Sequence, residues 1–281
     1  MFNRYILLIL ALVCYLSGNA QLSTSKLFFD HLTTEEGLAH NYILSIFQDE
    51  DGFVWLGSDN GLNRYDGQHI DILSSNTKPA LGGNRIRRII QDKSKTLWIL
   101  HENGLDMMDH YTQHIRSFLY GRELKKHILG FGLDDNGDLA AFTESDILLY
   151  NSNSGSFDIK QTAPANFLFS AFVKCGNRYY LGTRRHGIIV YNENWKLLEH
   201  IYPTSIQGGI LEDGLISLLR VDSNGSIWSV MAGLCIQKYD PVTRIVQTYP
   251  LSAHSVINRE VRDIIELNAD YMLVGTFNGL Y

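Results

Sequence analysis

The chain has 281 residues, of which 45% are hydrophobic and 19% are charged, so it can bury a sizeable core and is not expected to be disordered. Its formal net charge is -6, from 30 acidic and 24 basic residues, which argues against a surface that binds nucleic acid or an anionic membrane. We therefore expect a globular protein that binds no nucleic acid.

The N-terminus has the pattern of an export signal. Arg4 provides a positive charge, residues 5–16 are almost entirely apolar, and Gly18 and Ala20 are small residues at the two positions that a signal peptidase reads. An apolar run of this length is too short to cross a bilayer. We predict a signal peptide over residues 1–20, cleaved after Ala20, with an uncleaved anchor as the alternative.

The rest of the sequence repeats about every 44 residues. In the first unit, four short runs rich in β-branched, aromatic and aliphatic residues alternate with turns in which Gly follows Asp or Asn. These runs are Tyr42–Phe47, Phe53–Gly57, Leu62–Tyr65 and His69–Leu73. Four antiparallel strands per unit at this period are typical of propeller blades, because a lone four-stranded sheet cannot bury both of its faces.

A large side chain in each second strand is expected to fill the wedge between neighbouring blades. The residues at this position are Trp55, Trp98, Ala140, Tyr180, Trp228 and Leu273. Burying such an aromatic is worth roughly 2–3 kcal/mol. Ala140 is small, so we expect either a looser contact in the third unit or compensation from Phe142.

These units predict an all-β fold, a β-propeller of four-stranded antiparallel blades over residues 21–281. We expect about five complete blades and a partial sixth. Leu27–Phe29 is similar to an outer strand for a closing blade. A ring of about seven such blades needs sequence beyond Tyr281. We therefore expect the chain to be a fragment or a truncated product with an incomplete ring.

The first unit resembles the two-component regulator propeller repeat over Leu32–Leu38, Asn41 and Gln48–Gly67. The other units match this repeat less closely, the third and fourth most weakly. The resemblance implies the periplasmic sensor region of a hybrid two-component system that detects an oligosaccharide. It also implies a longer protein, anchored in the inner membrane, with a second propeller, an immunoglobulin-like domain, a histidine kinase, a receiver and a DNA-binding domain.

A ligand surface is expected where the blade-to-blade loops meet the loops between second and third strands, which share one face of a propeller. Guanidinium groups in such loops suit sugar hydroxyls and carboxylates. The candidate ligand-binding residues are His40, Asn41, Arg85, His101, Glu102, Arg184, Arg185 and His186. Further polar residues of the same loops are Asn84, Lys126, His127, Asn166 and Asn258. The alternative for each residue is a solvated turn.

The sequence holds no motif for catalysis, metal or cofactor binding. It lacks HExxH, GxSxG and a glycine-rich phosphate loop. Asp134–Asp138 faintly resembles a calcium loop but falls at the first hairpin turn of its unit. Cys175 and Cys235 lie at different positions of two repeats, so we expect no disulfide. No metal, no cofactor and no enzymatic activity are expected.

Our leading hypothesis is therefore a periplasmic propeller that binds an oligosaccharide and signals to a kinase absent from this chain. Its partners would be that ligand and the missing domains of the same protein, and a homodimer stays open. Two alternatives remain. One is a propeller polysaccharide lyase or glycoside hydrolase whose carboxylates come from different blades. The other is a protein-interaction scaffold.

Overall fold

The computed structural model describes residues 31–134, 136–201, 214–232, 235–251, 261–268, 271–276 and 279–280. The chain divides into two units, residues 1–32 and 33–281, and every described strand lies in the second. The predicted signal peptide and the Leu27–Phe29 strand lie outside the described residues. No helix within the described ranges is long and apolar enough to cross a membrane.

The described strands of the second unit form antiparallel sheets of consecutive strands, and each sheet is one blade. Blade 1 contains β1 (Ile43–Gln48), β2 (Val54–Ser58), β3 (Gly61–Tyr65) and β4 (Ile70–Leu73). Blade 2 contains β5 (Ile86–Gln91), β6 (Leu97–His101), β7 (Gly104–Met108) and β8 (Ile115–Leu119). Blade 3 contains β9 (Gly130–Leu133), β10 (Leu139–Phe142), β11 (Asp146–Asn151) and β12 (Ser156–Thr162).

The second half of the chain continues the same order. Blade 4 contains β13 (Phe169–Cys175), β14 (Arg178–Thr183), β15 (Ile188–Asn192) and β16 (Leu197–Ile201). Blade 5 contains β17 (Ile216–Val221), β18 (Ile227–Met231), β19 (Cys235–Tyr239) and β20 (Val246–Pro250). The described strands of blade 6 are β21 (Val261–Asn268), β22 (Tyr271–Thr276) and β23 (Gly279–Leu280).

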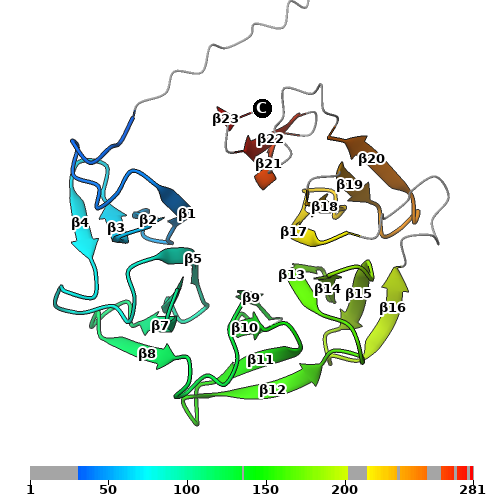
Figure 1. Cartoon of the computed structure of the whole chain (residues 1–281), viewed down its shortest axis with the longest axis horizontal. Helices are drawn as coiled ribbons and strands as arrows, with labels where there is room; N and C mark the ends of the chain where they lie inside the picture. The colour runs from blue at the N-terminus through cyan, green and yellow to red at the C-terminus, as the bar shows by residue number, and fades with distance from the viewer. Residues whose placement is uncertain are drawn as a thin grey trace, which may run out of the picture. The chain divides into compact units, whose positions relative to one another are not determined.

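The blades are arranged around a common centre, with the first strand of each sheet innermost and the fourth strand of blades 1–5 outermost (Figure 1). This confirms the predicted all-β propeller, with five four-stranded blades and a partial sixth. The four strands predicted for the first unit agree with β1–β4 to within about one residue at each end. The predicted incompleteness of the ring stays a prediction.

An aspartate organises the first hairpin turn of four blades. Its Oδ1 accepts the backbone N–H groups two and four residues later, which fixes the tight turn. These aspartates are Asp49, Asp92, Asp134 and Asp222. In blade 3, Gly137 completes the turn with a φ of 75°. The segment that resembles a calcium loop is therefore the β9–β10 hairpin turn.

In three blades the same aspartate also holds the wedge tryptophan. Its Oδ2 accepts the indole N–H of the residue six positions later, at 2.7 Å for Trp55, 2.8 Å for Trp98 and 2.9 Å for Trp228. Each indole packs in a buried cluster with residues of the following blade. The bond satisfies the one polar atom of the ring, so the rest of the ring can be buried. The predicted wedge role of these tryptophans is confirmed.

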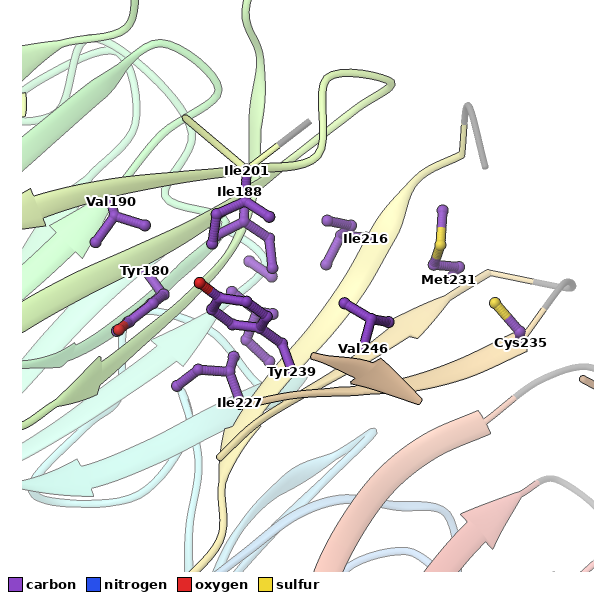
Figure 2. Close-up of a cluster of buried hydrophobic side chains, with 12 residues drawn as sticks. Tyr180, Ile188, Val190, Ile201, Ile216, Ile227, Met231, Cys235, Tyr239 and Val246 are labelled. Atoms are coloured by element: carbon purple, nitrogen blue, oxygen red, sulfur yellow. The ribbon is translucent and has the colours of Figure 1, made fainter. Parts of the chain in front are cut away.

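A buried apolar cluster lies between each pair of successive blades from blade 1 to blade 6. Figure 2 shows the cluster between blades 4 and 5, where Tyr180 and Ile188 face Ile216 and Tyr239. Each blade thus buries its faces against its neighbours, as the repeat pattern predicts.

In blade 3, the space at the wedge position is filled by a side chain of the next blade and not by the blade's own residue. Ala140 pairs with Gly132, so neither side chain fills the space above the sheet. Phe172 of blade 4 occupies it, because a Cβ added to Gly132 would lie only 2.6 Å from the Phe172 ring. Phe142 is also buried, with its ring centroid 6.1 Å from that of Phe172. The expected compensation from Phe142 is confirmed, and the neighbouring blade adds a second aromatic.

Candidate ligand-binding surface

The blade-to-blade connections and the second-to-third-strand turns are joined by backbone hydrogen bonds. Gly61 N–H donates to the carbonyl of Asn84 at 2.7 Å, and Phe169 N–H donates to the carbonyl of Glu144 at 2.7 Å. We call the face formed by these turns and the adjoining connections the loop face. Its described turns are residues 59–60, 102–103, 143–145 and 184–187.

His40 and Asn41 lie in the segment that leads into β1, and both are exposed. The Oδ1 of Asn41 accepts the N–H of Thr34 at 2.7 Å, and the Nδ1 of His40 accepts the N–H of Tyr42 at 3.0 Å. Each side chain therefore orders its own segment and still reaches solvent.

Arg85 and Glu102 brace the contact between blades 1 and 2. The Nε of Arg85 lies 2.8 Å from the Oδ1 of Asp59, while Glu102 accepts the backbone N–H groups of Asn84 and Arg85 at 3.0 and 2.8 Å. Burial alone would raise the pKa of Glu102, but the backbone donors outweigh it and hold the pKa below its usual value. Glu102 thus stays ionised and fixes the connection that carries Arg85.

The structure corrects the placement of His101 in an accessible loop. His101 is the last residue of β6 and is 0% exposed. Its Nε2 faces the Oδ1 of the equally buried Asp106 at 3.3 Å, and its Nδ1 accepts the N–H of Asn103 at 3.2 Å. The repeat pattern of the sequence places His101 in the loop between the second and third strands. The carboxylate five positions on allows it to be buried instead.

Arg184, Arg185 and His186 form the turn between β14 and β15. The guanidinium of Arg184 contacts Glu144 of blade 3 at 2.7 Å. Arg185 adopts a φ of 89° and is exposed. The His186 ring lies 4.4 Å from the ring of Phe167, and its carbonyl contacts the ring of His200. Of the three, Arg185 is the side chain most available to a ligand.

The predicted residues fall into two groups on the loop face, one at blades 1 and 2 and one at blades 3 and 4. Lys126 belongs with the second group, since its Nζ bonds Ser145 and Asp146 of blade 3. Within the described part of the chain, no hydrogen bond or ion pair joins the two groups. Asn258 lies outside the described residues. The structure therefore brings the candidates to one face but not into one cluster.

A separate cavity of about 840 Å³ lies among the innermost strands of the propeller. Its lining comes from β1, β5, β17 and β21, with a contribution from β22. Among the described residues that line it, Arg87, Arg88, Arg220 and Arg262 bring four guanidinium groups, and Asp263 is the one carboxylate. We call this space the central cavity.

The central cavity is not predicted by the sequence patterns above, although the repeats contain a signal for it. The strand register shifts between Ile86 and Arg88 and between Val261 and Asp263, so Arg87 and Arg262 are the extra residues of two β-bulges. Bulges redirect side chains and are frequent beside binding sites. Aligning the second and sixth units places an arginine at the same bulge in both.

Neither a metal centre nor a disulfide is found in the described residues. No group of three or more His, Cys, Asp or Glu there could hold a metal ion. Cys175 and Cys235 form no disulfide, and burial raises the pKa of the Cys175 thiol.

One comparison identifies the repeat itself. Residues 37–60 match the family model described as two component regulator propeller. This confirms the resemblance of the first unit to that repeat. A search of curated proteins finds no match to the chain.

Solved structures share the fold at low sequence identity. The extracellular domain of BT3049 from B. thetaiotaomicron, assigned to a hybrid two component system, is 19% identical with a TM-score of 0.68, covering 89% of this chain and 34% of that chain. PorZ of the type-IX secretion system of Porphyromonas gingivalis is 14% identical with a TM-score of 0.64, covering 85% of this chain and 38% of that chain. Virginiamycin B lyase from Staphylococcus aureus is 13% identical with a TM-score of 0.58, covering 74% and 69%. The chain thus spans little more than a third of the first two structures.

Proposed function

We propose that this chain is an extracytoplasmic ligand-sensing propeller of a hybrid two-component regulator. In this proposal it recognises an oligosaccharide in the periplasm and passes the signal to a kinase outside this chain. The observation that carries the proposal is the match of residues 37–60 to the two component regulator propeller repeat. Shared architecture with the extracellular domain of BT3049 over 89% of the chain supports it.

The export pattern of residues 1–20 agrees with an extracytoplasmic location. The further parts of the sensor, including a second propeller, a membrane anchor and the kinase, would be the partners of this region. The sensor needs no chemistry of its own, and the loop-face residues are engaged mainly in positioning backbone and in ion pairs. A recognition surface is therefore favoured over a catalytic one.

An enzyme remains the second candidate, since a lyase of known structure has the same fold. A lyase or hydrolase would need a base or a pair of carboxylates facing one substrate. The described loop-face carboxylates Asp59, Glu102 and Glu144 each engage a neighbouring arginine side chain or backbone amides. Because these carboxylates are already engaged, the arrangement favours a binding role over a catalytic one.

A binding screen with the purified chain tests the proposal. Titration calorimetry against neutral and acidic oligosaccharides should find one class that binds, with no release of reducing ends or unsaturated products. Arg185→Ala should weaken binding if the loop face is used, while Lys160→Ala, at an exposed position of the outermost strand β12, should not. Turnover of a bound sugar would favour the enzyme. A folded chain that binds no sugar would favour the scaffold.

A second test addresses signalling. Disrupting the gene in its source organism should abolish the transcriptional response to the oligosaccharide that binds the purified chain. An unchanged response would contradict the sensor role.

A further inference from the structure

The central cavity has an excess of positive charge. Its described lining holds four guanidinium groups and one carboxylate, in a protein whose overall charge is negative. Cavities with one sign of charge and low-dielectric walls concentrate ions of the opposite sign. This charge contrast is the first sign that the cavity binds an anion.

The carboxylate of the cavity is already paired. The Nη2 of Arg220 lies 2.8 Å from the Oδ1 of Asp263 and 2.9 Å from its Oδ2. Asp263 therefore neutralises Arg220 first. Arg88 and the bulge arginine Arg87 bring further positive charge to the cavity.

The surroundings of Arg88 disfavour the positive charge of its guanidinium group. Burial, and after it repulsion from Arg220, lower its pKa to about 10, against a smaller opposing attraction from Asp263. It stays charged at neutral pH. Its guanidinium lies 5.8 Å from the centre of the Phe131 ring, and among the described residues it pairs with no carboxylate. Arg88 is half-buried, and a partly desolvated donor fork gains from an anionic partner.

We propose that the central cavity is a binding site for an oxyanion group of a ligand, a carboxylate or a sulfate, held by Arg88 together with the bulge arginines Arg87 and Arg262. Guanidinium groups match both oxyanions through paired hydrogen bonds. The three come from β5 and β21, on blades 2 and 6, so the anion would bridge parts of the propeller far apart in the sequence.

The remaining lining suits the body of such a ligand. Ile46 and Ile265 line the cavity and are 70% and 64% exposed, so they offer apolar surface beside the charged groups. A cavity of about 840 Å³ lies within the range of small-ligand sites. If the ligand is an oligosaccharide, it is an acidic one. That last step rests on the proposed function, whereas the anion site does not.

Two substitutions that change the charge of the cavity in opposite directions test the site in the full chain. The probes are sodium sulfate, titrated at constant ionic strength, and a trisaccharide of galacturonic acid, with maltotriose as the neutral control. Arg88→Gln should weaken binding of both anionic probes about tenfold, as expected for loss of a charge-assisted hydrogen bond. Asp263→Asn should strengthen it about threefold or more, because Arg220 is released. Lys160→Gln is the matched control for the loss of one positive charge at an exposed position outside the loop face and the cavity.

The outcomes separate this inference from the proposed function. Opposite effects of Arg88→Gln and Asp263→Asn, with circular dichroism unchanged, support the cavity site. Equal effects of Arg88→Gln and Lys160→Gln, or no sulfate binding, overturn it. If a neutral sugar binds and neither anionic probe does, the cavity site fails and the oligosaccharide sensor stands. If sulfate binds through Arg88 but no sugar binds anywhere, the sensor proposal fails and the anion site stands.

Discussion

Asn63 and Asp106 occupy equivalent positions in successive repeats, and each accepts a hydrogen bond from the segment that enters its blade. Each is the third residue of the third strand in its blade and is 0% exposed. The Oδ1 of Asn63 accepts the N–H of Ala39 at 2.8 Å, and the Oδ2 of Asp106 accepts the N–H of Gly82 at 2.8 Å. In both cases a buried side chain anchors the segment that enters the blade by accepting one of its backbone amides.

This equivalence predicts how Asp106 tolerates substitution. Asp106→Ala leaves the Gly82 amide and the His101 ring without their partner, so the free energy of unfolding should fall by about 1–3 kcal/mol. Asp106→Asn keeps an acceptor and should cost less than half of that, because Asn63 serves the same purpose in blade 1. Urea denaturation measures both. Equal losses would instead assign the effect to the contact with His101.

The tryptophans of the blade interfaces should act mainly through packing. Trp98 is 0% exposed and its ring centroid lies 4.7 Å from that of Tyr150 in blade 3. Trp98→Ala should lower the free energy of unfolding by about 3–5 kcal/mol. Trp98→Phe keeps an aromatic ring but leaves the Asp92 carboxylate without the indole N–H, so its cost should be about 1–3 kcal/mol. Similar losses for the two variants in denaturation experiments would contradict a dominant packing role.

The sequence was sufficient to predict the blades because their pattern is local. Alternating apolar residues and Gly-containing turns define β1–β4 to within about one residue, and the wedge position follows from the repeat. How neighbouring strands and blades pack on one another depends on residues that the local pattern does not connect. The burial of His101 depends on Asp106 across a hairpin, and the hollow above Ala140 is filled by Phe172 from the next blade. Such pairings are visible only once the sheets are placed.

The central cavity was missed for the same reason. Its arginines come from β5, β17 and β21, which are separated by more than a hundred residues at the extremes. Each of these strands carries one or two arginines, which read as exposed polar residues in an otherwise aliphatic run. Only the radial arrangement brings the innermost strands together, and only the register shifts reveal the bulges that carry Arg87 and Arg262.

Close contacts between blades predict that replacing glycine by alanine lowers stability by different amounts at two equivalent positions. A Cβ at Gly182 would lie 2.6 Å from the Cγ2 of Ile216 in blade 5, whereas at Gly275 the nearest atom would be 3.7 Å away. Gly182→Ala should therefore destabilise the chain by about 1–3 kcal/mol, and Gly275→Ala should be close to neutral. Thermal denaturation of the two variants checks this. A loss at Gly275 as large as at Gly182 would show that the backbone conformation of the strand, rather than blade contact, sets the cost.

Acid should weaken the contact that Asp222 makes in blade 5. Burial would raise the pKa of Asp222, but hydrogen bonds from Trp228 and Lys238 outweigh it and hold the pKa below the usual value of 3.8. A carboxyl whose pKa is lowered by folding contributes stability above the unfolded pKa, and this is lost as the pH falls through the folded pKa. The free energy of unfolding, measured by urea denaturation, should thus decline as the pH is lowered past about 4. Asp222→Asn should be less stable at neutral pH and lose less on acidification. An unchanged slope in this variant would show that other carboxylates, such as Asp146 beside Lys126, govern the acid response.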